Sequence, residues 1–321
     1  MRALICADYQ GIDALEVGEL ADPRPGPDSV LVAVASVTVN FADTLMVSGQ
    51  YQLRPDPPFA PGYELAGTVI EAAEGFAAGD RVCGFVPYGG MAERVVIPAA
   101  SVDHLPDEVD FDAGATLPGT YGTSYHALVD RAHLEPGETL LVLGAAGGVG
   151  LAAVQIGKAL GATVIAAVSS PEKEELVSSA GADQVIRYDD VGLRDGIDQA
   201  TTGKGIDVVY DPVGGDATEQ ALRSTRWNGR LLVVGFAAGP IPRIPLNIPL
   251  LKGNSVVGVF WGRFTTEEPV KSETNRRQVL DWAAGGTIAP RIGARFALED
   301  GREALRSVAE RRAVGRVVIN P

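Results

Sequence analysis

Cysteine and histidine are scarce in this chain of 321 residues, which has two cysteines and three histidines. Cys6 and Cys83 both lie in apolar, strand-like contexts, which favours buried thiols over a disulfide or a metal pair and is typical of a reducing cytoplasm. The histidines, His104, His126 and His133, have no HxxH or HxxE spacing, so ordinary structural or surface roles are the better interpretation. The sequence therefore predicts no metal site and a cytoplasmic location.

Positive charge and long apolar runs are also in short supply. The net charge of −14 disfavours a basic surface for nucleic acid, since phosphate neutralisation supplies most of that affinity. No apolar run approaches the roughly 18 residues of a membrane span. The first ten residues, MRALICADYQ, lack a long apolar core and a cleavage site, so we interpret them as a strand and not as a signal peptide. We expect neither a nucleic-acid nor a membrane partner, and the length predicts two domains.

The most informative stretch is residues 139–170, TLLVLGAAGGVGLAAVQIGKALGATVIAAVSS. It predicts a buried parallel strand, a glycine-rich turn, a helix and a second strand. The turn has the dinucleotide spacing, with Ala145 in the first glycine position, then Gly147 and Gly150. Amides at the start of the helix would hold the phosphates, although a turn without a ligand is the alternative. The turn residues expected to contact a cofactor are Gly144, Ala146, Gly147, Gly148 and Val149.

The end of the second strand bears on which nucleotide is bound. NAD-preferring units place an acid there to bind the ribose hydroxyls, and this chain has none at the tip. Ser170 is predicted to cap the next helix and Pro171 to begin it, which puts the Lys173 cation in a first turn whose dipole opposes it. Lys173, Ser169 and Ser170 suit a 2′-phosphate, so we predict NADPH over NADH. Glu172 could instead bind a ribose, and Lys173 could be a solvated surface residue.

The wider pattern divides the chain. Short strands separated by proline and glycine dominate residues 1–118 and predict a barrel-like β domain. Alternating strands and helices follow, as in a doubly wound parallel sheet. The tail, 290–321, should return to the first domain, because the sheet around the glycine turn already has its full complement of strands. Expected strands include 30–40, 64–73, 81–86, 91–97, 184–188, 207–211, 230–236 and 254–261; expected helices include 41–48, 111–117, 120–133, 172–180, 193–200, 217–225 and 270–284.

Longer motifs carry a family resemblance over nearly the whole chain. They are NFADTLMVSGQYQ (40–52), PGYELAG (61–67), GDRV (79–82), LPGTYGTSYHAL (117–128), GAAGGVGLAAVQIGKALGA (144–162), DVVYDPVGG (207–215), GRLLVVGFAAG (229–239) and VVGVFWG (256–262). Through them the chain resembles the zinc-free, zeta-crystallin-like quinone oxidoreductase branch of the medium-chain dehydrogenase/reductase superfamily. The resemblance implies an α/β fold with two domains and an active site in the cleft between them. The two implied domains are a GroES-like β-rich catalytic domain, residues 1–123 and 263–321, and a Rossmann nucleotide-binding domain with a doubly wound parallel sheet, residues 124–262.

The same resemblance implies NADPH as the cofactor and a homodimer paired through the strand at 254–261. It assigns Lys173, Tyr188 and Arg312 to the 2′-phosphate. Along the nicotinamide half it places Thr123, Phe236, Phe260 and Trp261, with Asn40 nearby.

Two departures from relatives limit what the resemblance implies. Zinc-dependent members have a histidine in a Gly-His-Glu element, where this chain has Gly62-Tyr63-Glu64, and the four-cysteine lobe of the structural zinc is missing. Many quinone reductases have a tyrosine where this chain has Leu45, so no catalytic role is transferred from that tyrosine. The LMVSGQYQ form resembles instead relatives that reduce enoyl thioesters or enals.

Hydride chemistry without a metal favours particular substrates. Dehydrogenating a simple alcohol usually requires a Lewis acid, whereas quinones and conjugated carbonyls accept hydride as a stabilised phenolate or enolate that water can protonate. The protein must then place hydrogen-bond donors near the oxygen, and Asn40, Tyr51 and Tyr63 are the candidates. Asn40 could instead cap the helix at 41–48, and either tyrosine could simply pack against the β domain. We expect NADPH-dependent reduction of quinones or α,β-unsaturated carbonyls; the alternatives are an acryloyl-CoA-like enoyl-thioester reductase and a non-catalytic, crystallin-like nucleotide-binding protein.

Overall fold

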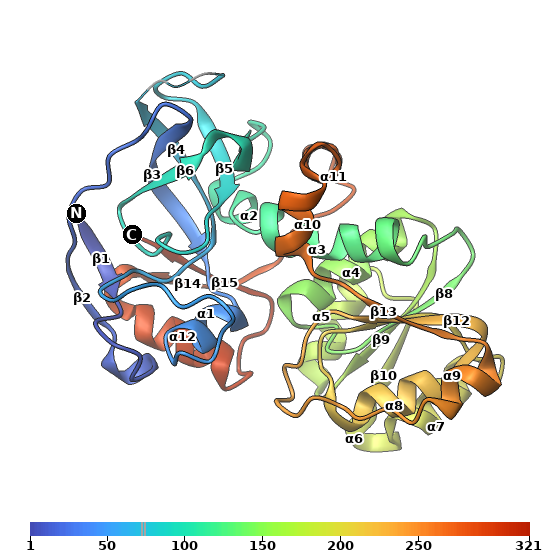
Figure 1. Ribbon diagram of the computed structural model, residues 1–321. Helices are drawn as coiled ribbons and strands as arrows, with labels where there is room; N and C mark the ends of the chain where they lie inside the picture. Colours follow the sequence, from blue (N-terminus) through green and yellow to red (C-terminus); the bar gives the residue numbers. More distant parts are fainter. Residues whose placement is uncertain (72, 74) are drawn as a thin grey trace. The chain divides into compact units, whose positions relative to one another are not determined.

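The structure is a computed structural model that describes residues 1–71, 73 and 75–321 (Figure 1). Residue 72, within the strand expected at 64–73, lies outside the described residues. The chain divides into two units, Met1–Gly119 with Arg276–Pro321, and Thr120–Asn275. The domain limits expected at 123/124 and 262/263 remain a prediction.

Strands from both ends of the chain share one sheet in the first unit. The red C-terminal strand β15 pairs antiparallel with the blue β3, with Val318 opposite Thr38, so the expected return of the tail is confirmed (Figure 1). Val and Leu side chains from these strands form the buried core, and the cysteines Cys6 and Cys83 are free and buried. Along the sheet the order is β14 (Ile292–Ala297), β15 (Arg316–Asn320), β3 (Ser29–Thr38), β4 (Glu64–Glu71), β5 (Arg81–Phe85) and β7 (Val102–His104), with β6 (Arg94–Pro98) also on β3.

Smaller elements complete the first unit. A helix, α12, packs on α1, which lies where the sequence predicted a helix at 41–48. The elements are β1 (Arg2–Ile5), β2 (Glu16–Glu19), α1 (Phe41–Met46), α2 (Phe111–Gly114) and α12 (Gly301–Ala309).

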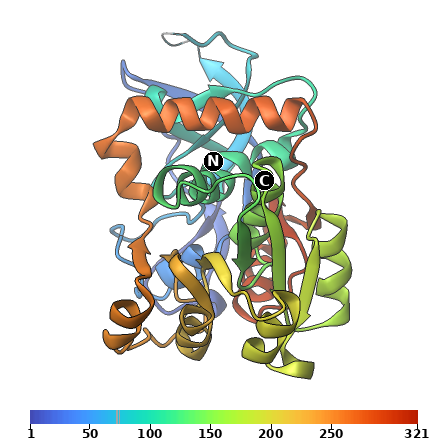
Figure 2. The same ribbon diagram turned by 90° about the vertical axis from the view of Figure 1, so that its right-hand side faces the viewer.

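The second unit contains a parallel sheet whose strands follow the order β10-β9-β8-β11-β12-β13. In chain order this is 3-2-1-4-5-6, the doubly wound arrangement that the alternation of strands and helices predicted. Crossovers to either side of β8 put α4 and α8 on opposite faces (Figure 1), and α5 and α9 lie toward opposite edges (Figure 2). The strands are β8 (Thr139–Val142), β9 (Thr163–Val168), β10 (Gln184–Arg187), β11 (Ile206–Asp211), β12 (Thr225–Val233) and β13 (Ser255–Gly258).

The helices of the second unit include the one predicted after the glycine turn. They are α3 (Gly122–Tyr125), α4 (Gly148–Ala159), α5 (Pro171–Ser179), α6 (Tyr188–Val191), α7 (Leu193–Ala200), α8 (Gly215–Arg223), α9 (Asn247–Lys252), α10 (Trp261–Glu267) and α11 (Pro269–Ala284), the last running past Asn275. None of the described helices combines the length and hydropathy that crossing a bilayer requires.

Several predicted boundaries were wrong. The strand expected at 254–261 ends at Gly258, and Trp261 begins α10. The helix expected at 217–225 ends at Arg223, and β12 begins at Thr225, well before the strand expected at 230–236. The helix expected at 111–117 stops at Gly114, and π-helical turns interrupt the one expected at 120–133.

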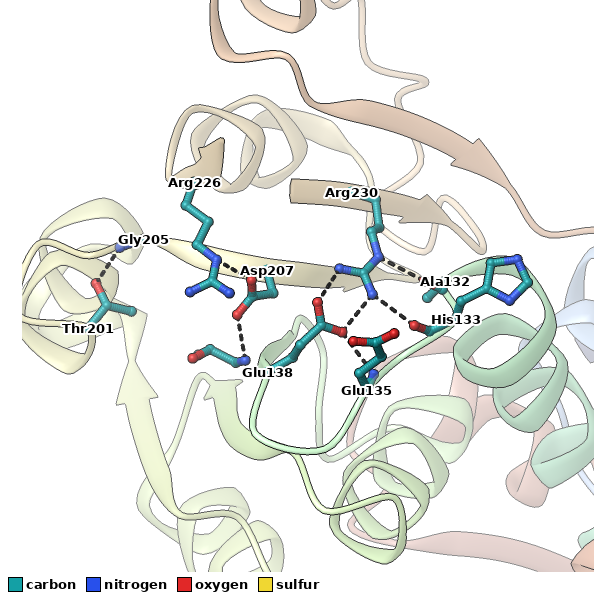
Figure 3. A network of polar contacts seen from close by, with 10 residues as sticks. Ala132, His133, Glu135, Glu138, Thr201, Gly205, Asp207, Arg226 and Arg230 are labelled. Carbon is teal, nitrogen blue, oxygen red and sulfur yellow. Dashed lines mark hydrogen bonds and ion pairs between the residues drawn. The ribbon is translucent and has the colours of Figure 1, made fainter. Parts of the chain in front are cut away.

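Ion pairs lie at the end of the parallel sheet where β8, β11 and β12 begin, hereafter the N-terminal edge (Figure 3). Arg230 forms a two-pronged ion pair with Glu138, at 2.6 Å for each N–O distance, and both side chains are only 17% exposed. Asp207 accepts the backbone N–H of Thr139 at 2.8 Å and pairs with Arg226. These contacts join β12 to the starts of β8 and β11.

Candidate functional site

The glycine turn lies at the opposite end of that sheet, hereafter the C-terminal edge. Gly144 has a φ of +57°, and its carbonyl accepts the N–H of Gly147 at 2.9 Å. A Cβ at Gly150 would overlap the Gly144 carbonyl oxygen and come within 2.9 Å of the Ala145 Cα. The turn therefore requires glycine at 150, in agreement with the predicted close packing, and it leaves Gly147 exposed as the N-cap of α4.

Buried hydroxyls fix the start of α4. Ser124 Oγ donates to the Val149 carbonyl and lies 2.8 Å from the Tyr210 hydroxyl. Tyr121 donates to Gln155 Oε1 at 2.8 Å. Burial raises the pKa of Tyr210, so its hydroxyl stays protonated. These contacts attach the segment around Thr120–Tyr125 to the helix that follows the glycine turn, and the sequence predicted none of them.

The predicted 2′-phosphate residues of this unit gather at the ends of β9 and β10. Ser170 caps α5 by accepting the Lys173 N–H, as predicted, at 3.4 Å. The Lys173 ammonium donates to Ser169 Oγ at 3.2 Å. Because Arg187 pairs with Val168 in the sheet, Tyr188 follows beside Ser169, and it is 38% exposed. The Lys173 ammonium and the Ser169 hydroxyl thus meet at the C-terminal edge, and Tyr188 follows the neighbouring strand.

The residues predicted for the nicotinamide half in this unit also follow strand ends. Phe236 follows β12 and Phe260 follows β13, and both are exposed. Trp261 is buried, and its indole Nε1 lies 3.0 Å from where a Cβ on Gly122 would stand, next to Thr123. In parallel α/β sheets ligands bind at this carboxyl edge, near the point where the strand order reverses.

Arg312, also predicted near the 2′-phosphate, belongs to the first unit. Its guanidinium pairs with Glu303 and Glu310, both at 2.7 Å. A role for Arg312 at a phosphate stays a prediction.

In the first unit, Asn40 lies in a buried polar cluster with Glu64 and Arg316. Asn40 Nδ2 donates to Glu64 Oε1 at 3.0 Å, and Arg316 Nη2 donates both to Asn40 Oδ1 and to Glu64 Oε1 at 2.9 Å. The Glu64 and Arg316 side chains are 0% and 7% exposed. A fully buried carboxylate is therefore neutralised by one guanidinium.

Asp43 extends this cluster. It accepts the backbone N–H of Asn40 at 2.8 Å and of Gly62 at 3.1 Å, so it joins the start of α1 to the segment before Tyr63. Burial raises the pKa of Asp43 to about 7, against the lowering effect of the two backbone N–H groups. Asn40 is the N-cap residue of α1, as its structural interpretation predicted.

Both candidate tyrosines stay protonated. Burial raises the pKa of Tyr51, and burial together with the charge of Glu64 raises the pKa of Tyr63 well above its ordinary value. The Tyr63 ring covers Gly119, whose N–H donates to Glu64 Oε2 at 2.9 Å. These phenols can donate hydrogen bonds, but they are poor proton donors.

The described side chains around Tyr63 and Glu64 lack the ligands that a metal ion would need. Within residues 1–71, 73 and 75–321, no group of three or more His, Cys, Asp or Glu side chains is placed to hold a metal ion. Tyr63 stands at the histidine position of zinc-dependent relatives, and Glu64 beside it binds Arg316. This arrangement does not fit a zinc ion.

Comparison with known proteins identifies the family. Residues 26–107 match the alcohol dehydrogenase GroES-like domain, and residues 148–282 match the zinc-binding dehydrogenase family. The chain is 37% identical over 324 residues to quinone oxidoreductase-like protein 2 of Rattus norvegicus, covering 99% of this chain and 92% of that one. It is 35% identical over 319 residues to a quinone oxidoreductase of Pseudomonas aeruginosa, covering 98% of each.

The chain belongs to the quinone oxidoreductase branch of the medium-chain dehydrogenase/reductase superfamily. Its fold, a GroES-like domain with a Rossmann-like parallel-sheet domain, agrees with the prediction. The crystal structure of the Escherichia coli quinone oxidoreductase complexed with NADPH is 28% identical, covers 100% of both chains and superimposes with a TM-score of 0.91.

Sequence reasoning did not predict the buried cluster of Asn40, Glu64 and Arg316. Glu64 and Arg316 are 252 positions apart, and no local pattern marks them as a pair. Asp43 was assigned no role from the sequence, although it is buried and accepts the backbone N–H groups of Asn40 and Gly62. The signal available for this cluster was the PGYELAG motif, in which Tyr63 and Glu64 stand among residues that are buried.

Proposed function

We propose that the protein transfers a hydride from NADPH to quinones or other conjugated carbonyl compounds, without a metal ion. The observation that carries the cofactor assignment is the hydrogen bond from the Lys173 ammonium to Ser169 at the C-terminal edge, with Tyr188 just after the neighbouring strand. Lys173 forms no ion pair with the residues that the structure describes, so its charge is available to a phosphate.

In this proposal, the backbone amides of the glycine turn hold the diphosphate, together with the dipole of α4. Ser169, Ser170, Lys173, Tyr188 and Arg312 bind the 2′-phosphate. A bound NADPH would supply a hydride from C4 of its nicotinamide. The residues proposed for the nicotinamide half are Asn40, Thr123, Phe236, Phe260 and Trp261.

Asn40, Tyr51 and Tyr63 are proposed to orient the acceptor by donating hydrogen bonds to its oxygen. Raised pKa values keep both phenols protonated, which supports a donor role and leaves water as the source of the proton. Asn40→Ala should lower kcat/KM about tenfold or more, beyond any loss of stability. Unchanged kinetics would remove Asn40 from the site.

Independence from metal is supported by the chemistry of the cluster. An arginine neutralises Glu64, and Tyr63 replaces the histidine that zinc would need. A conjugated acceptor does not require a Lewis acid, because its charge is delocalised. Elemental analysis of the purified protein should find no stoichiometric zinc.

We also propose a homodimer that joins the exposed edge strand β13 of two chains. Val256 on β13 is 44% exposed, and Trp227, Leu246 and Leu250 are between 69% and 81% exposed. Unpaired strands with apolar neighbours associate readily. Sedimentation should give a dimer for the wild type and a monomer for Val256→Asp. The two buried thiols support a cytoplasmic location.

The deciding experiment follows NADPH oxidation with 9,10-phenanthrenequinone, a 2-alkenal and crotonyl-CoA. The proposal expects turnover of the quinone or the alkenal and a higher kcat/KM for NADPH than for NADH. Turnover of crotonyl-CoA alone would favour an enoyl-thioester reductase. Nucleotide binding without turnover would favour a non-catalytic protein.

A further inference from the structure

Three neighbouring strands deliver the cluster around Asn40. β3 runs antiparallel to both β15 and β4, with Val37 opposite Ile319 on one side and opposite Leu65 on the other. The end of β3 therefore lies near the first residues of both neighbours: Thr38 is opposite Val318, two residues past Arg316 in β15, and Val37 is opposite Leu65, next to Glu64 in β4. Asn40 follows shortly after β3, and so sheet topology alone brings the three side chains together.

The hydrogen bonds fix which way the Asn40 amide points. Its oxygen accepts from the Arg316 guanidinium, and its nitrogen donates to the Glu64 carboxylate. Rotating the amide by half a turn would set its oxygen against the carboxylate and its NH₂ group against the guanidinium. Both new contacts would be repulsive in a site with little water, where charge interactions are strong.

The same carboxylate holds a second part of the first unit. Glu64 Oε2 accepts the N–H of Gly119, and the Tyr63 ring covers that glycine. Arg316 Nε is buried and forms no hydrogen bond with the described residues. Leaving this donor unsatisfied costs free energy, so stability of the core alone does not explain an arginine at this position.

We infer that Glu64 and Arg316 are positioning residues, which act on the reaction by fixing the orientation of the Asn40 amide. This inference rests on the proposed function, in which Asn40 lies at the nicotinamide and the acceptor. Neither Glu64 nor Arg316 needs to touch the substrate. Their effect on catalysis should therefore pass through Asn40 and disappear when Asn40 is truncated.

A double-mutant cycle tests this dependence. Glu64→Gln should lower kcat/KM about tenfold or more when Asn40 is present, and less than about twofold when Asn40 is alanine. Equal factors in the two backgrounds, or no loss in the first, would overturn the inference. kcat/KM is measured well below the Tm of each variant, so that loss of folded protein does not contribute to either factor.

A single substitution that leaves a buried charge unpaired can prevent folding. The neutral pair Glu64→Gln with Arg316→Met removes both charges together, and its cycle with Asn40→Ala has the same expected outcome. Arg276→Met is a matched control, since Arg276 forms a similarly buried ion pair with Asp103 in the first unit. It should lower Tm and leave kcat/KM within about twofold of the wild type.

A crystal structure of Glu64→Gln gives a readout that needs no turnover. The Asn40 side chain should rotate away from its wild-type orientation or become disordered, and an unchanged Asn40 would overturn the inference. If the wild type reduces no quinone or enal, the proposed function fails on its own, whereas the orientation of Asn40 in the variant still decides the positioning role.

Discussion

The two edges of the parallel sheet in the second unit differ in how their polar groups are used. At the N-terminal edge, carboxylates and guanidinium groups neutralise one another: Arg230 binds Glu138 and two backbone carbonyls, and Arg226 binds Asp207 (Figure 3). At the C-terminal edge, backbone amides of the glycine turn and the Lys173 ammonium are held mainly by hydroxyls and carbonyls.

This difference separates stability from binding within one sheet. Pairs at the N-terminal edge are complete, so they can contribute to stability but offer little to a ligand. At the C-terminal edge, the Lys173 ammonium pairs with no carboxylate of the described chain, so its charge is available to an anion. Variants at the N-terminal edge should therefore lower stability with little change in nucleotide affinity, whereas variants at the C-terminal edge should lower nucleotide affinity.

Gly150→Ala should have the largest effect. The added Cβ overlaps the Gly144 carbonyl, which displaces the turn amides from the diphosphate and raises the Kd for NADPH at least about a hundredfold. Titration calorimetry measures it. Gly157→Ala is the matched control on the same helix, since its Cβ would meet the Leu140 side chain and not the turn; it should lower Tm with little change in Kd.

At the other edge, Arg230→Met should lower the free energy of unfolding by about 3 kcal/mol, because it leaves the carboxylate of Glu138 without its partner in a largely buried place. Urea denaturation gives the free energy. NADPH affinity should change less than about twofold. A large loss of affinity with unchanged stability would contradict the division between the edges.

Lys173→Ala should raise the Kd for NADPH about tenfold and leave that for NADH nearly unchanged, because only NADPH carries the 2′-phosphate. Lys158→Ala is a suitable control, since Lys158 pairs with Asp183 at 2.7 Å. A preference for NADH in the wild type, or an equal loss for both nucleotides in Lys173→Ala, would refute the phosphate assignment.

The smallest effect concerns pH. Burial raises the pKa of Glu138, but hydrogen bonds from Arg230 and from the Glu135 N–H outweigh it, so the net pKa lies below the ordinary value of 4.5. Its contribution to stability is therefore present above pH 4.5 and is lost as the pH falls through the lowered pKa. The stability advantage of the wild type over Glu138→Gln should shrink in that acidic range. A constant difference across pH would contradict the pairing.

Much of the fold could be predicted because its signals are local. The strand, turn and helix around Gly150, the Ser170 cap and the return of the tail all follow from periodicity, capping chemistry and strand count. The end of β13 could not be predicted in this way. The run VVGVFW is apolar and β-rich throughout, and the packing of Trp261 against Gly122, which no local pattern contains, accompanies a helix there.

The candidate site was predictable at the C-terminal edge and less so in the first unit. Residues such as Ser169 and Lys173 follow strand ends, so the order of strands and helices along the sequence predicts where they lie. Glu64 and Arg316 meet only because β4 and β15 flank β3, a pairing that single-sequence patterns do not contain. Long-range pairing, and not the identity of the residues, limited the prediction.

Calorimetric titration of the wild-type protein with NADPH and then with NADH tests the central claim most directly. The account predicts one nucleotide per chain, with tighter binding of NADPH. Absence of binding by either nucleotide would contradict the assignment of the C-terminal edge.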